Sequence, residues 1–129
     1  MTEMAAWRET YYGALEFVDE AYRLSHSFAD PDALGLQLRR AAALLALTLG
    51  DNAAACNPQD RFDRASAYLA ECATALSEIE RRANAPETRY RCAAGSLLHL
   101  ANLLTRLQPL QRRKAEHRRQ FYFSTSASS

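Results

Sequence analysis

The sequence has little of what a β-rich protein needs. Its 129 residues include only 4 glycines and 4 prolines, and these two residues supply most of the tight turns that join strands. Alanine, leucine, arginine and glutamate, which favour helices, are abundant instead. We therefore expect a single all-α domain in which glycine and proline mark the helix ends.

Cysteines and long apolar runs are also few. Cys56, Cys72 and Cys92 are odd in number and form no CxxC pair, a pattern that favours neither a disulfide framework nor a zinc ribbon and that suits a reducing compartment. The longest apolar stretch, Ala41 to Leu49, is about half of what a bilayer span requires. The first residues lack the basic and apolar segments of a secretory signal. We expect a cytoplasmic protein that does not span a membrane.

Apolar residues recur at helical spacings of three and four in four segments. The apolar stripe of the third segment alternates most regularly between spacings of three and four, and Leu15 and Tyr22 widen the stripe of the first segment. The stripes are Trp7, Tyr11, Ala14, Val18 and Ala21; Leu34, Leu38, Ala41, Leu45 and Leu49; Phe62, Ala65, Leu69, Cys72, Leu76, Ile79 and Ala83; and Ala93, Leu97, Leu100, Leu104 and Leu107. Four such helices joined by short loops predict an antiparallel up-down-up-down four-helix bundle.

Proline and capping residues separate these segments. The first helix should run from about Glu3 to Ser27, and Asp30-Pro31-Asp32 should start the second. Asn57 and Pro58 should cap and open the third helix. Pro109 should end or kink the fourth, because proline lacks the N–H that a helix interior uses. We assign residues 1–120 to the bundle and residues 121–129 to a serine-rich C-terminal tail.

The second helix carries more apolar residues than one stripe needs. Leu36, Ala43, Leu44 and Leu47 lie outside its stripe, so three neighbours in a monomeric bundle would leave them uncovered. We predict that these four residues form an oligomer interface. The alternative is that this helix is the most central of the four and that the extra leucines fill a thick core.

The sequence contains no pattern typical of catalysis or metal binding. No Glu-x-x-His pair of the kind that builds metal sites in bundles occurs, and His26, His99 and His117 lie on different segments. No nucleophile elbow, phosphate-binding glycine loop or dinucleotide fingerprint is present. We expect neither a catalytic site nor a metal or cofactor.

Basic residues concentrate at two places. Arg39 and Arg40 are adjacent in the second helix, so they diverge by about 100° and at most one can face the core edge. Near the C-terminus, a cluster of five bases precedes three aromatic residues, a composition that suits contact with RNA phosphates and bases. The cluster is Arg112, Arg113, Lys114, Arg118 and Arg119, followed by Phe121, Tyr122 and Phe123. The alternative is a solvated helix end, since the net charge of the whole chain is only +1.

One segment resembles a known family. Leu34-x-x-Gln37-Leu38-Arg39-Arg40-Ala41-Ala42, followed by Gly50-Asp51-Asn52, resembles the signature of bacterial four-helix-bundle proteins encoded within intervening sequences of ribosomal RNA genes. The run Ala75-Leu76-Ser77-Glu78-Ile79-Glu80 is similar to a Leu-Ala-Glu-Leu-Glu run of that family, and the likeness extends from about Trp7 to Gln108. The chain departs from the family at Leu44-Leu45 and at Thr48 to Asn52, where the family has Ser-Ile and Asn-Ile-Ala-Glu-Gly.

The resemblance implies an assembly and a class of partner. Members of the family form rings of subunits, commonly five. One branch, the accessory proteins of diversity-generating retroelements, binds a reverse transcriptase and nucleic acid. We therefore expect a non-enzymatic homo-oligomer, a pentameric ring, that binds RNA or a reverse-transcriptase-like protein through Arg39 or Arg40 and the C-terminal cluster. The alternative is a protein-interaction scaffold that binds no nucleic acid.

Overall fold

The computed structural model describes residues 3–28, 33–50, 57–83 and 85–127, the last of these as backbone alone from residue 108 onward. The described residues form four α-helices and no strand. They are α1 (Glu3–His26), α2 (Ala33–Gly50), α3 (Pro58–Arg82) and α4 (Glu87–Ala127). The prediction of an all-α chain with four helices is confirmed.

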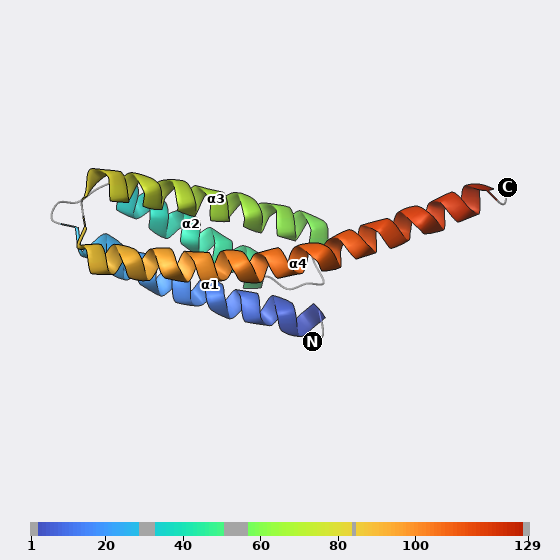
Figure 1. Cartoon of the computed structure of the whole chain (residues 1–129), viewed down its shortest axis with the longest axis horizontal. Coiled ribbons are helices and arrows are strands. Elements are labelled where there is room, and N and C mark those ends of the chain that lie inside the picture. Colours follow the sequence, from blue (N-terminus) through green and yellow to red (C-terminus); the bar gives the residue numbers. More distant parts are fainter. Residues whose placement is uncertain (1–2, 29–32, 51–56, 84, 128–129) are drawn as a thin grey trace.

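The four helices lie side by side around one core (Figure 1). Each helix packs against two others, in the cyclic order α1, α2, α3, α4, and α3 with α4 form the least extensive of the four pairs. The largest fully buried apolar side chains come from all four helices. They are Phe17, Leu24, Leu38, Leu45, Leu49, Ile79, Leu100 and Leu107. This arrangement is compatible with a four-helix bundle.

The ends of α3 follow the predicted chemistry. Asn57 is the N-cap, its side chain accepts a hydrogen bond of 2.8 Å from the backbone N–H of Gln59, and Pro58 opens the helix. Ala83 ends the helix in the left-handed region, with φ of 51°, and its N–H donates to the Glu80 carbonyl at 3.0 Å. The predicted break at residues 30–32 lies outside the described residues, as do Cys56 and Asn84.

The predicted stripe of α3 is confirmed at its centre. Ala65, Cys72, Leu76 and Ile79 are buried, and Phe62 and Leu69 are partly buried against the core. Ala83 is exposed because it lies beyond the last residue of the helix.

The stripe of α1 was placed slightly off its true centre. Trp7, Ala14 and Ala21 are buried as predicted, but Leu15 and Tyr22 are 42% and 54% exposed. The positions that complete the buried face are Thr10, Gly13, Phe17 and Leu24. A search for apolar residues misses this face because two of its positions are threonine and glycine. The Thr10 hydroxyl donates a hydrogen bond of 2.8 Å to the Ala6 carbonyl.

Pro109 was predicted to end or kink α4, and the helix does not end there. The backbone remains helical to Ala127, because a proline removes one hydrogen bond while the turns on either side keep theirs. In Figure 1, α4 changes direction where it leaves the other helices and projects beyond them, as an interior proline would cause. We call residues 108–127 the C-terminal arm.

Among the described residues, α2 is the one helix that also has the length and apolar composition of a membrane span. A helix in the core of a soluble bundle has the same features, and 39% of the residues of α2 are buried against the rest of the chain.

Candidate interaction surfaces

The outward face of α2 carries a stripe of three apolar residues and one arginine. Leu36, Arg40, Ala43 and Leu47 recur at spacings of four, three and four, so they lie along one side of the helix. Leu36 is 61% exposed and Leu47 is 68% exposed, and Arg40 and Ala43 are exposed as well. Leu44 is half-buried beside this stripe. The thick-core alternative is therefore wrong for Leu36 and Leu47, which lie on the surface of the single chain.

Helix α1 also carries exposed apolar side chains, among exposed charged ones such as Arg8 and Asp19. Met4, Tyr12, Leu15 and Tyr22 are between 42% and 72% exposed. The two helices approach closely, since a Cβ at Gly35 would lie 3.2 Å from Cβ of Ser25, and a Cβ at Gly50 would collide with Tyr11. We call the exposed apolar side chains of the two helices, together with Ala43 and Arg40, the α1–α2 face.

Arg39 and Arg40 diverge as predicted. Arg39 is half-buried at the boundary with α1, and its guanidinium carbon lies 5.7 Å from the centroid of the Tyr22 ring, within the range of a cation–π contact. Its Nε is shielded from solvent and has no hydrogen-bond partner among the described residues. Arg40 is exposed in the middle of the outward face, so only Arg40 is presented for contact with a partner.

The C-terminal arm carries the other predicted cluster away from the bundle. Five bases, Arg112 to Arg119, stand against the single acid Glu116 in this segment. The rest of the chain has 11 bases and 14 acids. The backbone of the arm projects beyond the other helices (Figure 1), and the side chains of the cluster lie outside the described part. The structure thus does not bring this cluster together with Arg39 and Arg40.

A buried arginine, which sequence patterns did not single out, joins three helices. Arg61 of α3 is 9% exposed. Its Nε donates to the Thr48 carbonyl at 2.9 Å, and its guanidinium also donates to the Leu49 carbonyl. The guanidinium carbon lies 4.4 Å from the centroid of the Trp7 ring. Arg61 therefore satisfies carbonyls at the C-terminal end of α2, which have no partner within the helix, and it fixes where α2 ends.

A shallow apolar groove of about 390 Å³ runs between α3 and α4. Its α3 side is lined by small side chains at spacings of four, three and four together with Leu69 and Leu76, and its α4 side includes Ala94, Leu98 and Ala101. The small residues of α3 are Ser66, Ala70, Ala73 and Ser77. We call this feature the α3–α4 groove. Neither the groove nor its small-residue wall was foreseen, because these residues lie beside the apolar stripe and read as surface positions.

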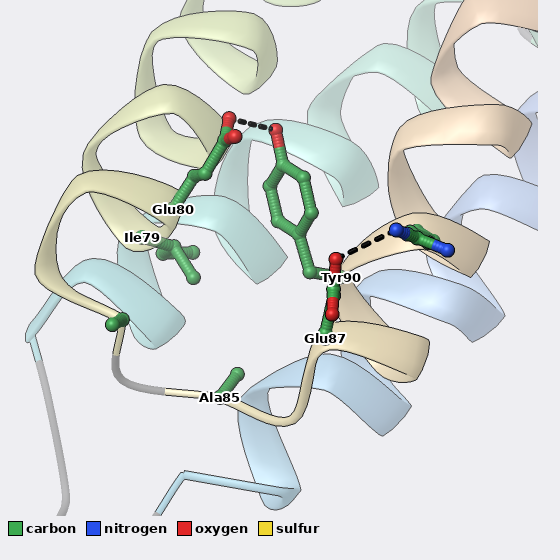
Figure 2. Close-up of a pocket in the computed structure, with 7 residues that line it drawn as sticks. Ile79, Glu80, Ala85, Glu87 and Tyr90 are labelled. Carbon is green, nitrogen blue, oxygen red and sulfur yellow. Dashed lines mark hydrogen bonds and ion pairs between the residues drawn. The ribbon is translucent and has the colours of Figure 1, made fainter.

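A pocket of about 440 Å³, whose charged lining residues are Glu80, Glu87 and Arg91, continues from one end of the groove, at the turn between α3 and α4. Tyr90 lines both cavities. Figure 2 shows its ring standing between the two helices with the hydroxyl pointing at Glu80. Glu87 and Arg91 form an ion pair of 2.7 Å at the pocket edge. We call this cavity the turn pocket.

The hydrogen bond between Tyr90 and Glu80 is short. The Tyr90 hydroxyl donates to Oε2 of Glu80 at 2.6 Å. This bond, with burial and the nearby carboxylate charge as smaller causes, raises the pKa of Tyr90 to about 12. The phenol therefore stays protonated at neutral pH and holds α4 against α3.

The cysteine, histidine and acidic side chains of the described residues are the candidates for metal binding or nucleophilic catalysis. No three His, Cys, Asp or Glu side chains among them come together as metal ligands. Burial, with a smaller contribution from Glu71, raises the pKa of Cys72 to about 12, so this thiol is not a nucleophile at neutral pH. Cys92 is exposed. Nδ1 of His26 lies 2.9 Å from the Tyr22 carbonyl, at the end of its own helix.

Neither protein-family models nor curated proteins yielded a match to this chain. What the fold and its surfaces define is a class: an all-α chain of four packed helices with an exposed apolar face, an apolar groove and a projecting basic arm.

Proposed function

We propose that the protein is a non-enzymatic, self-associating four-helix module that binds RNA or a protein that itself handles nucleic acid. The observation that carries the proposal is the segregation of charge and apolar surface. Five bases occupy a helical arm that projects from an otherwise acidic body, and exposed apolar side chains gather on α1 and α2.

Antiparallel up-down-up-down topology is part of this proposal. Three pairs of residues from α1 and α2 support it for those helices. Tyr11 meets Gly50, Tyr22 meets Arg39, and Ser25 meets Gly35, so residues that come later in α1 meet residues that come earlier in α2. Arg61 near the start of α3 likewise meets Thr48 near the end of α2.

Self-association is supported by the α1–α2 face. Leu36 and Leu47 are more than half exposed in the single chain, and soluble proteins normally cover an apolar patch of this kind with a partner. We propose a closed homo-oligomer, and the resemblance to the ribosomal-gene family favours five subunits. Light scattering at micromolar concentration measures the mass and tests this proposal. A mass of one subunit would show that the protein does not form the proposed homo-oligomer.

RNA binding is supported by the charge of the arm. A helix with a net charge of +4 that stands clear of the bundle can approach a phosphate backbone without bringing the acidic body with it. The arginine and aromatic residues in the sequence of the arm are of the types that bind the phosphates and bases of single-stranded RNA. Arg40 adds a base on the bundle itself.

Salt dependence of RNA binding is the decisive test. Affinity for a generic single-stranded RNA should fall about tenfold or more between 50 and 200 mM salt, because each neutralised phosphate releases counterions. Replacing Arg112, Arg113 and Arg118 by glutamine should weaken binding and flatten the salt dependence. Gln replacement of Arg64, Arg81 and Arg91, all exposed on the bundle, is the matched control. Absence of binding at low salt would favour the alternative, a protein-interaction scaffold without nucleic-acid binding.

A further inference from the structure

Two aromatic rings lie against each other on the surface near the C-terminal end of α1. Tyr22 and His26 are one helical turn apart, their ring centroids are separated by 4.1 Å, and their planes differ by 34°. Nδ1 of His26 lies 2.9 Å from the Tyr22 carbonyl, which fixes the orientation of the imidazole. Tyr22 is 54% exposed and His26 is exposed as well. The pair therefore presents ring surface to the solvent.

A guanidinium lies beside the same rings. Arg39 reaches across from α2, and its Cζ lies 5.7 Å from the centroid of the Tyr22 ring. Arg40, the next residue of α2, is exposed. Two rings and a cation thus come together from two helices, with a second cation one residue away.

We propose that the exposed rings of Tyr22 and His26 stack against a nucleobase of single-stranded RNA and that Arg40 binds the adjoining phosphate. We call Tyr22, His26, Arg39 and Arg40 the stacking site. The inference rests on the proposed function and names the place on the bundle where a nucleobase binds. Tyrosine, histidine and arginine are side chains on which unpaired bases stack, because each presents a flat face.

The charges around the stacking site suit a phosphate. The acids on the neighbouring turn of α1, Asp19 and Glu20, lie 3.2 Å and 3.9 Å from the guanidinium of Arg23, so a base of their own helix balances part of their charge. Within the described part of the chain, Arg39 and Arg40 form no ion pair. A contact that only joined α1 to α2 would need neither an exposed Tyr22 nor a second ring against it.

The stacking site is separate from the other surfaces of the proposed function. Leu47 follows Arg39 by eight residues, about 12 Å along α2, and Tyr12 precedes Tyr22 by ten, about 15 Å along α1. Apolar side chains toward that end of the α1–α2 face can join subunits without covering the rings. In Figure 1, the C-terminal end of α1 lies at the end of the bundle opposite the C-terminal arm. A short oligonucleotide at the stacking site therefore does not reach the arm.

Binding of a short single-stranded oligoadenylate tests the inference. The measurement uses the full chain with Arg112, Arg113 and Arg118 replaced by glutamine, so that the arm contributes little. In this background Tyr22→Leu removes the flat face and should weaken binding at least about fivefold, the loss of one stacked base. The factor should be the same at low and high salt, because stacking releases no counterions. Tyr22→Phe keeps a ring and should bind like the background protein.

A chain of ribose phosphates without nucleobases separates stacking from charge. Tyr22→Leu should leave its binding unchanged. Arg40→Gln should weaken the binding of both chains and reduce the slope of log affinity against log salt by about 0.7, the effect of one phosphate contact on a single strand.

Tyr12→Leu is the matched control for Tyr22→Leu. Tyr12 is 58% exposed on the same helix, and its ring lies 5.9 Å from that of Tyr11. The cation–π contacts of the described residues involve Tyr22 and Trp7, so Tyr12 offers an exposed ring without a cation. Tyr12→Leu should bind both chains like the background protein.

The outcomes separate this inference from the proposed function. An unaltered protein that binds no RNA at low salt removes both. If the unaltered protein binds but replacement of the three arm arginines abolishes all binding, the stacking site is overturned and the proposed function stands. The same conclusion follows if Tyr22→Leu binds oligoadenylate unchanged, or if it loses equally on both chains. A Tyr22→Leu protein that changes its mass by light scattering but not its RNA affinity would assign the rings to subunit contact.

A second variant covers a failure of Tyr22→Leu to fold, which circular dichroism would reveal. His26→Ala removes the other ring at an exposed position of the helix end and should show the same selective loss of oligoadenylate binding. Unchanged binding by a folded His26→Ala protein would then overturn the inference.

Discussion

The guanidinium of Arg61 lies 4.4 Å from the centroid of the Trp7 ring while it donates hydrogen bonds to the carbonyls of Thr48 and Leu49. This one side chain of α3 thus contacts the Trp7 ring of α1 and the carbonyls at the C-terminal end of α2. The charge is tolerated at 9% exposure because backbone oxygens and an aromatic face replace water around it.

Removing this guanidinium should destabilise the fold. Arg61→Ala leaves carbonyls of α2 without their donor and Trp7 without its cation, and we expect a loss of about 2–4 kcal/mol, the range of charged hydrogen bonds and a partly buried cation–π contact combined. Arg61→Lys should lose less, because an ammonium keeps the charge but cannot reach two carbonyls in the same fork geometry. Urea unfolding measures both.

Arg64→Ala is the control for this experiment. Arg64 is exposed on the same helix, so its loss should change stability by less than about 0.5 kcal/mol. Equal losses for Arg61→Ala and Arg64→Ala would mean that the contact with Trp7 and α2 contributes nothing.

Helix number and most helix ends could be predicted because they depend on local chemistry. Asn57 and Pro58 define the start of α3 whatever the rest of the chain does. The apolar periodicity likewise identified Leu38, Leu45 and Leu49 as core. The structural role of Arg61 could not be recognised from the sequence, because it depends on contacts with backbone carbonyls 12 and 13 residues away and with a tryptophan of another helix.

The candidate surfaces were predictable only in part. Excess leucine in α2 pointed to an exposed face, and Leu36 and Leu47 lie there. The α3–α4 groove results from how closely two helices approach, which depends on the packing of all four. The side chains of Ala70 and Ala73 have no pattern of their own that would separate a groove from an ordinary helix surface.

Truncation of Leu76 should reveal the core position of the α3 stripe. Leu76 is 3% exposed, and Leu76→Ala should cost about 2–5 kcal/mol, the usual range for a buried leucine. Thr74→Ala, at an exposed position two residues earlier, should cost less than about 0.5 kcal/mol. A loss below about 1 kcal/mol for Leu76→Ala in denaturant melts would place the core elsewhere.

Alkaline pH should weaken the fold through Tyr90. Its pKa is raised to about 12 in the folded protein, above the value of about 10 for an unfolded tyrosine. The stabilisation is therefore complete below pH 10 and is lost as the pH rises from about 10 to about 12, because the unfolded chain releases its proton first. Tyr90→Phe should flatten the fall in unfolding free energy over this range.

Ultraviolet titration follows the same group directly. In the unaltered protein, one tyrosinate should appear near pH 12, and Glu80→Gln should shift it toward pH 10, because the carboxylate that accepts the hydrogen bond is gone. Tyr68→Phe, a change of another partly buried tyrosine, is the control and should leave this late step in place. A late step that persists in Tyr90→Phe would belong to a different tyrosine.

Two glycines should respond in opposite directions to the same added methyl group. At Gly95 a Cβ would meet nothing within 4 Å, so Gly95→Ala should stabilise α4 by about 0.5–1 kcal/mol, the difference in helix propensity. At Gly35 a Cβ would lie 2.7 Å from Cε2 of Phe28 and 3.2 Å from Cβ of Ser25. Gly35→Ala must therefore push α2 away from the end of α1, and overpacking of this kind costs about 1–3 kcal/mol. Thermal and urea unfolding of the two variants side by side would measure the contrast, and a Gly35→Ala protein as stable as Gly95→Ala would mean that the two helices are not in close contact at Gly35.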